Sequence, residues 1–195
     1  PTFYHFNDPI IIDDLHSICE NNLNNLKSCV FMDSKFLLKF NYNLNHLITN
    51  DYLPQYFNPN VKFQENIEKV IIGAGSVIGN SIQIASYLGF TEIYLVGCDC
   101  NYTIPKDVIK WGDKIKNSDY SNKYIISQSS DPNHFVPNYF GKGKHWHDPN
   151  VKRMISGHTQ CLNGIKKQNK TIINAGIHSK CEVYEKKNYK EVLKK

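Results

Sequence analysis

A strand, a glycine-rich turn, a helix and a second strand follow one another within residues 69–97, and this pattern constrains the fold most. The β-branched run at residues 69–72 predicts a buried strand, and glycines follow it at positions 73, 75 and 79. Apolar residues then recur at helical spacing up to Gly89, a residue type that commonly ends helices, and a second apolar run covers residues 92–97. This order is one βαβ unit, so we expect a parallel sheet with a right-handed crossover.

Hydrophobic periodicity predicts further elements of both types on either side of this unit. The predicted helices cover residues 9–26, 149–169 and 188–195, and the further strands cover residues 28–32, 171–174 and 181–184. Residues 41–63, rich in Asn, Tyr, Pro and His, are expected to be loop or short irregular helix. Residues 103–148, rich in polar, aromatic and turn-forming residues, are expected to be mainly loop. Because long loops commonly cover sites, we expect residues 103–148 to act as a lid.

Length and composition are those of a single folded domain. With 195 residues and 41% apolar residues, the chain is long enough to bury a core, and no apolar run approaches the ~20 residues that span a bilayer. We expect one α/β domain over residues 1–195, Rossmann-like, with three layers and a mainly parallel sheet. The chain opens on Pro1 without a secretion signal, so we also expect it to be truncated at its N-terminus and to be cytoplasmic.

Charge is distributed unevenly along the chain. Residues 1–140 contain 10 Lys/Arg and 14 Asp/Glu, whereas residues 141–195 contain 13 Lys/Arg and 4 Asp/Glu. The basic C-terminal quarter indicates an anionic partner such as a nucleotide, a sugar phosphate or the inner membrane surface, unless these lysines simply form a solvated face. Nucleic acid is disfavoured, because Arg153 is the sole arginine in the sequence.

The six cysteines suggest neither a disulfide scaffold nor a metal site. Cys98 and Cys100 form a C-x-C pair, but no C-x₂-C pair exists to frame a structural zinc. With no secretion signal, free thiols in a reducing compartment are the expectation. We therefore predict no metal.

The first candidate site is the turn after the first strand, at Gly73, Gly75 and Ser76. Glycines let a phosphate approach the backbone, and a following helix N-terminus offers oriented N–H donors. The spacing is a loose variant of the dinucleotide fingerprint, and Asp99 closes the next strand where a ribose-binding acid would stand. A nucleotide or nucleotide-sugar phosphate, a nicotinamide dinucleotide, and a plain structural turn are the three alternatives.

The second candidate site is the histidine-rich segment at residues 131–149. His145 and His147 flank Trp146, and an imidazole is the common general base for a hydroxyl; as a metal pair, H-x-H lacks a third ligand. A single histidine is more often structural than catalytic, so it is the cluster that indicates a function. The further residues that could bind phosphate or substrate here are Asn133, His134, Tyr139, Lys142 and Lys144.

The third candidate site follows the strand at residues 171–173. Asn174 and Gly176 stand at the carboxyl edge of the predicted sheet, where open α/β folds bind ligands, and His178 or Ser179 could contact a substrate. The alternative is a plain turn between two strands.

Residues 73–102 resemble the core of the MptE-like superfamily, which includes archaeal 6-hydroxymethylpterin diphosphokinases and bacterial proteins encoded among surface-polysaccharide genes. They are also similar to bacterial lipooligosaccharide sialyltransferases, which share the pattern A-x-x-L-G-[FY]-x-E-I-Y-L-x-G-x-D. The stretches D-P-N-H-F-V-P-N-Y-F-G-K-G-K-H-W-H-D-P and I-I-N-A-G-I-H-S-K-C-E-V-Y resemble the polysaccharide-locus branch. The resemblance covers roughly residues 65–190.

The sialyltransferase resemblance implies roles for residues of this chain. It puts Ser76 at the sugar-nucleotide donor, Asp99 and Tyr102 near the donor sugar or phosphate, and His145 or His147 in the role of the base. Two departures stand out: the family's T-S-G turn is Ala74-Gly75-Ser76 here, and a G-N-G-P-S donor loop is absent from the sequence. The missing loop fits the expected N-terminal truncation.

Three functions from different classes follow. The leading hypothesis is a sialyltransferase-like glycosyltransferase that moves a sugar from a nucleotide-sugar donor to a surface-glycan acceptor without a cofactor. The alternatives are an MptE-like pyrophosphokinase that moves diphosphate from ATP with Mg²⁺, and a non-catalytic module that binds a nucleotide or glycan.

Overall fold

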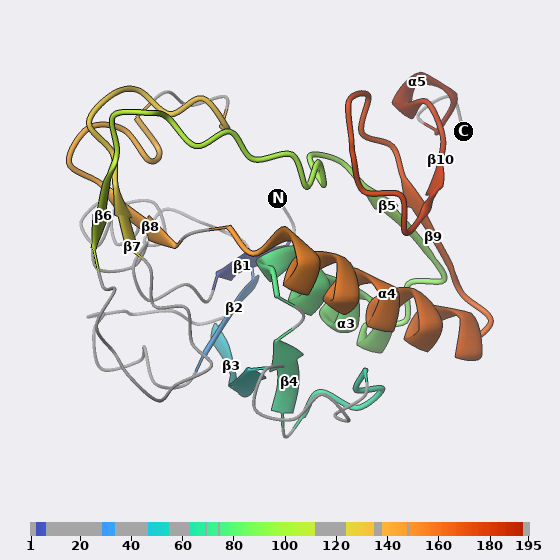
Figure 1. Ribbon diagram of the computed structural model, residues 1–195. Helices are drawn as coiled ribbons and strands as arrows, with labels where there is room; N and C mark the ends of the chain where they lie inside the picture. The colour runs from blue at the N-terminus through green and yellow to red at the C-terminus, as the bar shows by residue number, and fades with distance from the viewer. Residues whose placement is uncertain are drawn as a thin grey trace.

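Both helices and strands are present in the chain, and most of the strands run parallel (Figure 1). The computed structural model describes residues 3–6, 29–33, 47–54, 63–68, 70–73, 75–111, 124–134, 138–147 and 149–192. At this level the predicted α/β class is confirmed. The helix expected over residues 9–26 lies outside the described residues.

The strands among the described residues form three sheets. The first is parallel, in the order β1 (Phe3–Phe6), β2 (Cys29–Asp33), β3 (Leu47–Pro54) and β4 (Val70–Gly73). The second is also parallel, in the order β10 (Glu185–Lys186), β9 (Thr171–Asn174) and β5 (Glu92–Leu95). The third is antiparallel, in the order β6 (Ile109–Trp111), β7 (Tyr124–Ile126) and β8 (His145–His147).

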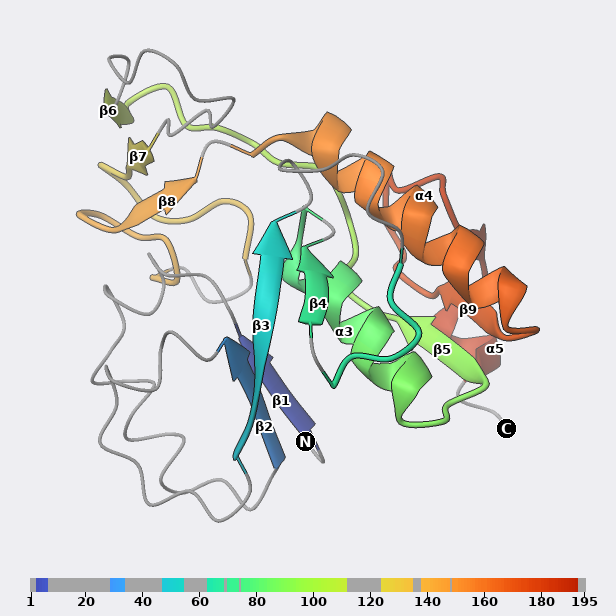
Figure 2. The same ribbon diagram turned by 90° about the horizontal axis from the view of Figure 1, so that it is seen from below.

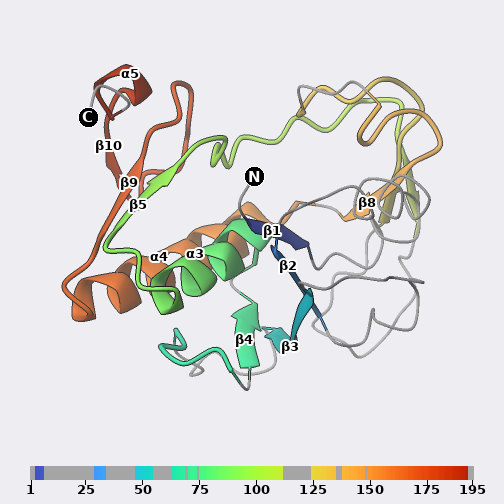
Figure 3. The same ribbon diagram turned by 180° about the vertical axis from the view of Figure 1, so that it is seen from behind.

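Two helices, α3 (Val77–Tyr87) and α4 (Val151–Lys167), lie side by side between the two parallel sheets (Figures 1 and 3). The sequence of α3 carries no charged residue, as expected for a helix that is covered on more than one side. Its Ile82 packs with β5, α4 and β9, whereas Ile84 packs with β2 and β4. The short helix α5 (Tyr189–Val192) closes the described part of the chain.

We expected β4 and β5 to share one parallel sheet, and in the structure they pair with different partners. The buried Gln83 of α3 explains why β4 ends its sheet. Its amide nitrogen donates to the carbonyl of Ile72 at 2.8 Å, and its amide oxygen accepts from the N–H of Ile72 at 3.3 Å. These are backbone groups that a further strand would otherwise use. The side chain therefore replaces a strand at that edge.

The pair β5 and β9 is the part of the fold that positions the site. Glu92 to Leu95 align in parallel with Thr171 to Asn174, and the connection between the two strands ends in α4, which packs on β9 (Figure 2). Because the two strands are parallel and in register, the segments that follow them leave the sheet at the same edge. The residues after Leu95 and after Asn174 therefore lie next to each other.

Three local predictions were wrong. Residues 41–63, expected to be loop or short irregular helix, contain β3, whose Ile48, Thr49 and Tyr52 are strand-forming types. Its first half pairs with β2 and its second half with β4. The 103–148 segment, expected to be mainly loop, forms the antiparallel sheet. The strand expected at residues 181–184 does not form, and pairing to β9 begins at Glu185. None of the helices among the described residues has the length and apolar character needed to cross a bilayer.

Candidate functional site

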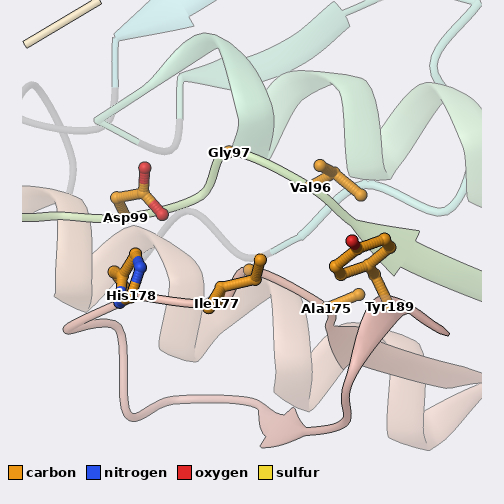
Figure 4. Close-up of a pocket in the computed structure, with 8 residues that line it drawn as sticks. Val96, Gly97, Asp99, Ala175, Ile177, His178 and Tyr189 are labelled. Carbon is orange, nitrogen blue, oxygen red and sulfur yellow. The ribbon is translucent and has the colours of Figure 1, made fainter. Parts of the chain in front are cut away.

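An open pocket of about 350 Å³ lies at the carboxyl ends of β5 and β9 (Figure 4). Asp99 and His178 stand on one side of it, and Val96 and Tyr189 stand on the other. Its lining comes from the two segments that leave the sheet together and from α5: Val96, Gly97, Asp99, Ala175, Gly176, Ile177, His178 and Tyr189. The pocket therefore lies at the edge where parallel α/β sheets place their ligands.

A buried hydrogen-bond network holds the two strand-end segments together. Asn174, which is 0% exposed, donates from its amide to the Ser179 hydroxyl at 2.8 Å and to the Cys98 carbonyl at 3.3 Å. Ser179 in turn donates to the Cys98 carbonyl at 2.7 Å and accepts from the Cys181 N–H at 3.0 Å. Every polar atom of this set has a partner, so the network is a rigid support for the pocket.

Asp99 is the carboxylate among the lining residues, and hydrogen bonds between the two strand-end segments fix its position. Its backbone carbonyl accepts from the Lys180 N–H at 2.8 Å, which ties it to the second segment. A Cβ at Gly176 would lie 3.3 Å from the Asp99 Oδ1 and 3.1 Å from the Asn174 Oδ1. The absence of a side chain at Gly176 thus leaves room for the carboxylate. The structure brings together Asp99, Asn174 and Gly176, three of the residues that the sequence singled out.

The glycine-rich turn lies apart from this pocket lining. Gly75 adopts a φ of +73°, and a Cβ there would lie 2.9 Å from the Arg153 carbonyl oxygen in α4. The left-handed backbone and the packing against α4 therefore each require glycine at this position, without any ligand. Ser76 caps α3, its hydroxyl accepting from the Gly79 N–H at 3.4 Å, and the same hydroxyl lies 3.5 Å from the His158 Nε2. Gly73 ends β4. The phosphate-binding role of this turn stays a prediction.

The histidine-rich segment builds a compact unit around Asp131, which is 7% exposed. Its carboxylate lies 2.7 Å from the His134 Nδ1 and accepts from the N–H groups of Asn133 at 2.7 Å and Phe140 at 3.0 Å. The ring of Tyr139 packs against that of His134, with centroids 4.6 Å apart and the ring planes tilted by 35°. Asn133 exchanges two hydrogen bonds with the backbone of Thr103, so the unit is attached to the segment that leaves β5.

Trp146 forms the core of the antiparallel sheet. It is 3% exposed, stacks on Phe140 with centroids 5.5 Å apart, and donates to the Ser127 hydroxyl at 3.0 Å. Because side chains alternate along a strand, His145 and His147 face away from Trp146; His145 is half-buried and His147 exposed. Figures 1 and 2 show β8 at the opposite end of the molecule from β5 and β9. The structure therefore does not bring these two histidines to the pocket.

The remaining predicted residues surround these two regions. Lys142 and Lys144 lie on the turn before β8, where the Lys144 N–H donates to the Gly141 carbonyl at 3.0 Å. Tyr102, which is 39% exposed, follows Asp99 on the segment that leaves β5, and burial raises the pKa of its phenol. His178, which the sequence placed among groups that could contact a substrate, lines the pocket.

The two segments that line the pocket, together with α4, also carry a cluster of side chains that no sequence motif indicated. Cys98, Cys100, Cys181 and His158 hold their ligand-type atoms within 4.8 Å of one another. Hydrogen bonds from the Cys100 and Cys98 thiols lower the pKa of the Cys181 thiol, and burial lowers the pKa of His158. A signal existed in the C-x-C pair at a strand end, but the other two members lie 58 and 81 residues beyond Cys100 in the sequence.

Comparisons with known proteins add no assignment: no protein-family model, no curated protein and no solved structure matches this chain.

Proposed function

We propose that this chain is a sialyltransferase-like glycosyltransferase domain that binds a nucleotide-sugar donor at the pocket after β5 and β9. One observation carries the proposal: a carboxylate, Asp99, stands in an open pocket at the carboxyl edge of two paired parallel strands. A carboxylate at that edge is suited to accept hydrogen bonds from ribose or sugar hydroxyls. The sequence resemblance supplies the reaction class, and a surface glycan is the proposed acceptor.

The charge near the pocket supports an anionic donor. The basic C-terminal quarter includes the segments that flank the pocket, where Lys180 and Lys190 are exposed next to Ser179 and Tyr189. Cationic side chains at the rim raise the local concentration of an anion and stabilise its phosphates. This supports a nucleotide-linked donor over a neutral sugar.

The pairing of β5 and β9 supports a nucleotide-binding fold. These two strands are parallel neighbours and their connection ends in a helix, so we interpret the parallel strands with α3 and α4 as a Rossmann-like arrangement within one domain. Ligands of such folds lie outside the carboxyl ends of the strands. The pocket occupies that position.

In the proposed reaction, an acceptor hydroxyl attacks the anomeric carbon of the donor sugar. The bond from this carbon to the phosphate oxygen breaks, and the nucleotide leaves with the bonding electrons. A base takes the hydroxyl proton. His178 is the imidazole that lines the pocket, and we assign the base to it. The resemblance instead favours His145 or His147, so the two assignments are separable by mutation.

The pyrophosphokinase alternative is less well supported by the lining. Mg²⁺ is held by oxygen ligands in a demanding octahedral geometry, usually with one or two carboxylates beside substrate phosphates. Asp99 is the one carboxylate among the lining residues. A single carboxylate surrounded by Val96, Ala175 and Ile177 favours hydroxyl recognition.

Calorimetric titration of the chain with CMP, UDP and ATP tests the donor site. We expect binding of a pyrimidine nucleotide without Mg²⁺, and we expect Asp99→Asn to weaken the binding of the corresponding nucleotide sugar about tenfold, which is about 1.4 kcal/mol. Asp107→Asn is the matched control, because it removes the same charge from the same segment outside the pocket lining. Equal losses in both variants, or no nucleotide binding at all, would contradict the proposal.

A transfer assay with CMP-sialic acid or a UDP-sugar and glycan acceptors then locates the base. His178→Ala is expected to lower kcat by a factor of about 100 or more, as loss of a general base does, while His145→Ala and His147→Ala retain most activity. The reverse outcome would move the base to β8. AMP release from ATP that EDTA abolishes would replace glycosyl transfer with diphosphate transfer.

A further inference from the structure

Four side chains of metal-binding types, three thiols and one imidazole, converge from three separate places in the fold. Cys98 and Cys100 come from the segment after β5, His158 from α4, and Cys181 from the segment after β9. Their ligand atoms lie within 4.8 Å of one another. Cys98, Cys181 and His158 are almost fully buried, at 1%, 0% and 1% exposure, and Cys100 is half-buried. We propose that Cys98, Cys100, Cys181 and His158 bind one Zn²⁺ ion.

The hydrogen bonds of His158 prepare its Nε2 as a ligand. Its Nδ1 lies 2.8 Å from the Tyr184 hydroxyl, and this hydroxyl lies 3.2 Å from the His158 carbonyl oxygen. A phenol has one proton, and donating it to the carbonyl leaves the hydroxyl oxygen to accept from Nδ1–H. The Nε2 atom then carries the lone pair, and it lies 3.7 Å from the Cys98 Sγ. Such an outer hydrogen bond is how proteins fix a metal-binding imidazole.

The spacing fits a tetrahedral zinc site. Zn–S bonds of about 2.3 Å and Zn–N bonds of about 2.0 Å give ligand-to-ligand distances of about 3.5 to 3.8 Å. The separation between Cys98 Sγ and His158 Nε2 falls in this range. Three thiolates and one imidazole are a common structural zinc set, and soft sulfur ligands select zinc over Mg²⁺ or Ca²⁺.

The proposed ion is structural and would hold together the segments that line the pocket. Four protein ligands complete a tetrahedron, which leaves no position for water or substrate. Asp99 lies between two of the ligands in the sequence, and its carboxylate faces the pocket lining. Zinc would therefore clamp the segment that carries Asp99 to α4 and to the segment after β9. Cys100 also has a φ of +52°, a backbone conformation uncommon for a non-glycine residue.

Metal analysis of the full chain, purified without chelator from zinc-supplemented medium, tests the proposal directly. We expect one equivalent of zinc, and we expect replacement by Co²⁺ to give the sulfur-to-metal charge-transfer absorption and intense visible bands of a tetrahedral thiolate site. Cys100→Ala should abolish stoichiometric binding. Cys161→Ala is the matched control, because Cys161 is a buried thiol of α4 outside the cluster.

Tyr184→Phe tests the site without removing a ligand. Loss of the hydroxyl that accepts from Nδ1–H should weaken zinc affinity about 10- to 100-fold in competition with a chelating dye. Three results would overturn the proposal: wild-type protein that takes up no metal, a Co²⁺ spectrum without charge transfer, or an intact mass lower by two hydrogens that shows a disulfide among the three thiols. Because the readout is metal content and spectrum, it is independent of nucleotide binding.

Discussion

Two regions of this chain concentrate polar and aromatic side chains, and they are assembled in opposite ways. The antiparallel sheet takes its core from residues near one another in sequence, with Ser127, Asp131, Phe140 and Trp146 in mutual contact or linked through one neighbour. The strand-end site after β5 and β9 joins residues that are far apart, because Cys98 contacts His158, Asn174 and Ser179. The antiparallel sheet is therefore expected to be stabilised mainly by its own local contacts. The strand-end site is expected to form only when the whole α/β core is folded.

This difference predicts separate stabilities for the two regions, and the largest effect is expected at Trp146. Trp146→Ala removes a buried aromatic side chain and should cost the antiparallel sheet about 4 kcal/mol. Hydrogen exchange should then speed up for the amides of β7 and β8 and stay unchanged in β5 and β9. Trp146→Phe is the milder control, because it keeps an aromatic partner for Phe140 and loses the bond to Ser127. Equal acceleration in β9 would mean that the two regions unfold as one unit.

Asn174→Ala should act on the whole α/β core. The change removes the two hydrogen bonds that the amide donates and the one that it accepts from the Gly176 N–H at 3.0 Å. At about 1 kcal/mol for each bond, the free energy of unfolding should fall by about 3 kcal/mol, measured by urea denaturation. Asn163→Ala, on the exposed face of α4, should change it by less than about 0.5 kcal/mol. A small effect at Asn174 would show that the network is not a support for the site.

The smallest effect on stability, and the most specific to the pocket, is expected for Gly176→Ala. The new Cβ would lie 3.1 Å from the Asn174 Oδ1 and 3.3 Å from the Asp99 Oδ1, close contacts that these two side chains can relieve by small shifts. We expect a stability loss below about 1 kcal/mol, together with a loss of nucleotide affinity of about tenfold, which is about 1.4 kcal/mol. Thr171→Ala, at the exposed opposite end of β9, should leave affinity unchanged. Unchanged nucleotide affinity in Gly176→Ala would show that the position of Asp99 does not affect ligand binding.

The sequence identified the elements and one half of the candidate site. Periodicity located β4, α3, β5, α4 and β9, since buried strands and amphipathic helices have distinct apolar spacing. Asn174 and Gly176 followed from the rule that ligands bind at the carboxyl ends of parallel strands. Asp99 followed from its place at the end of the strand after a loose dinucleotide fingerprint, and the family resemblance put it near the donor. The predictions for β3 and the antiparallel sheet were wrong because short strands rich in polar and aromatic residues depend on their neighbours more than on their own pattern.

Catalytic residue types are concentrated within 19 residues in the histidine-rich segment, so the sequence alone indicates it as a candidate site. The cluster of Cys98, Cys100, Cys181 and His158 has no such concentration in the sequence. In the linear sequence, Cys181 and His158 are single residues with no motif around them. The contact between β5 and β9, together with the packing of α4 on β9, brings them to Cys98.

The α/β class, the order of the best-defined elements and the strand end that carries Asp99 depend on local apolar patterns and chain direction, so they could be predicted from the amino-acid sequence. Three features become visible only in the folded chain: Gln83 closes the edge of β4, His178 lines the pocket while His145 and His147 lie at the far end of the molecule, and three cysteines meet one histidine. Each of these placements depends on how segments that are separated along the chain pack together, and no local pattern encodes that packing.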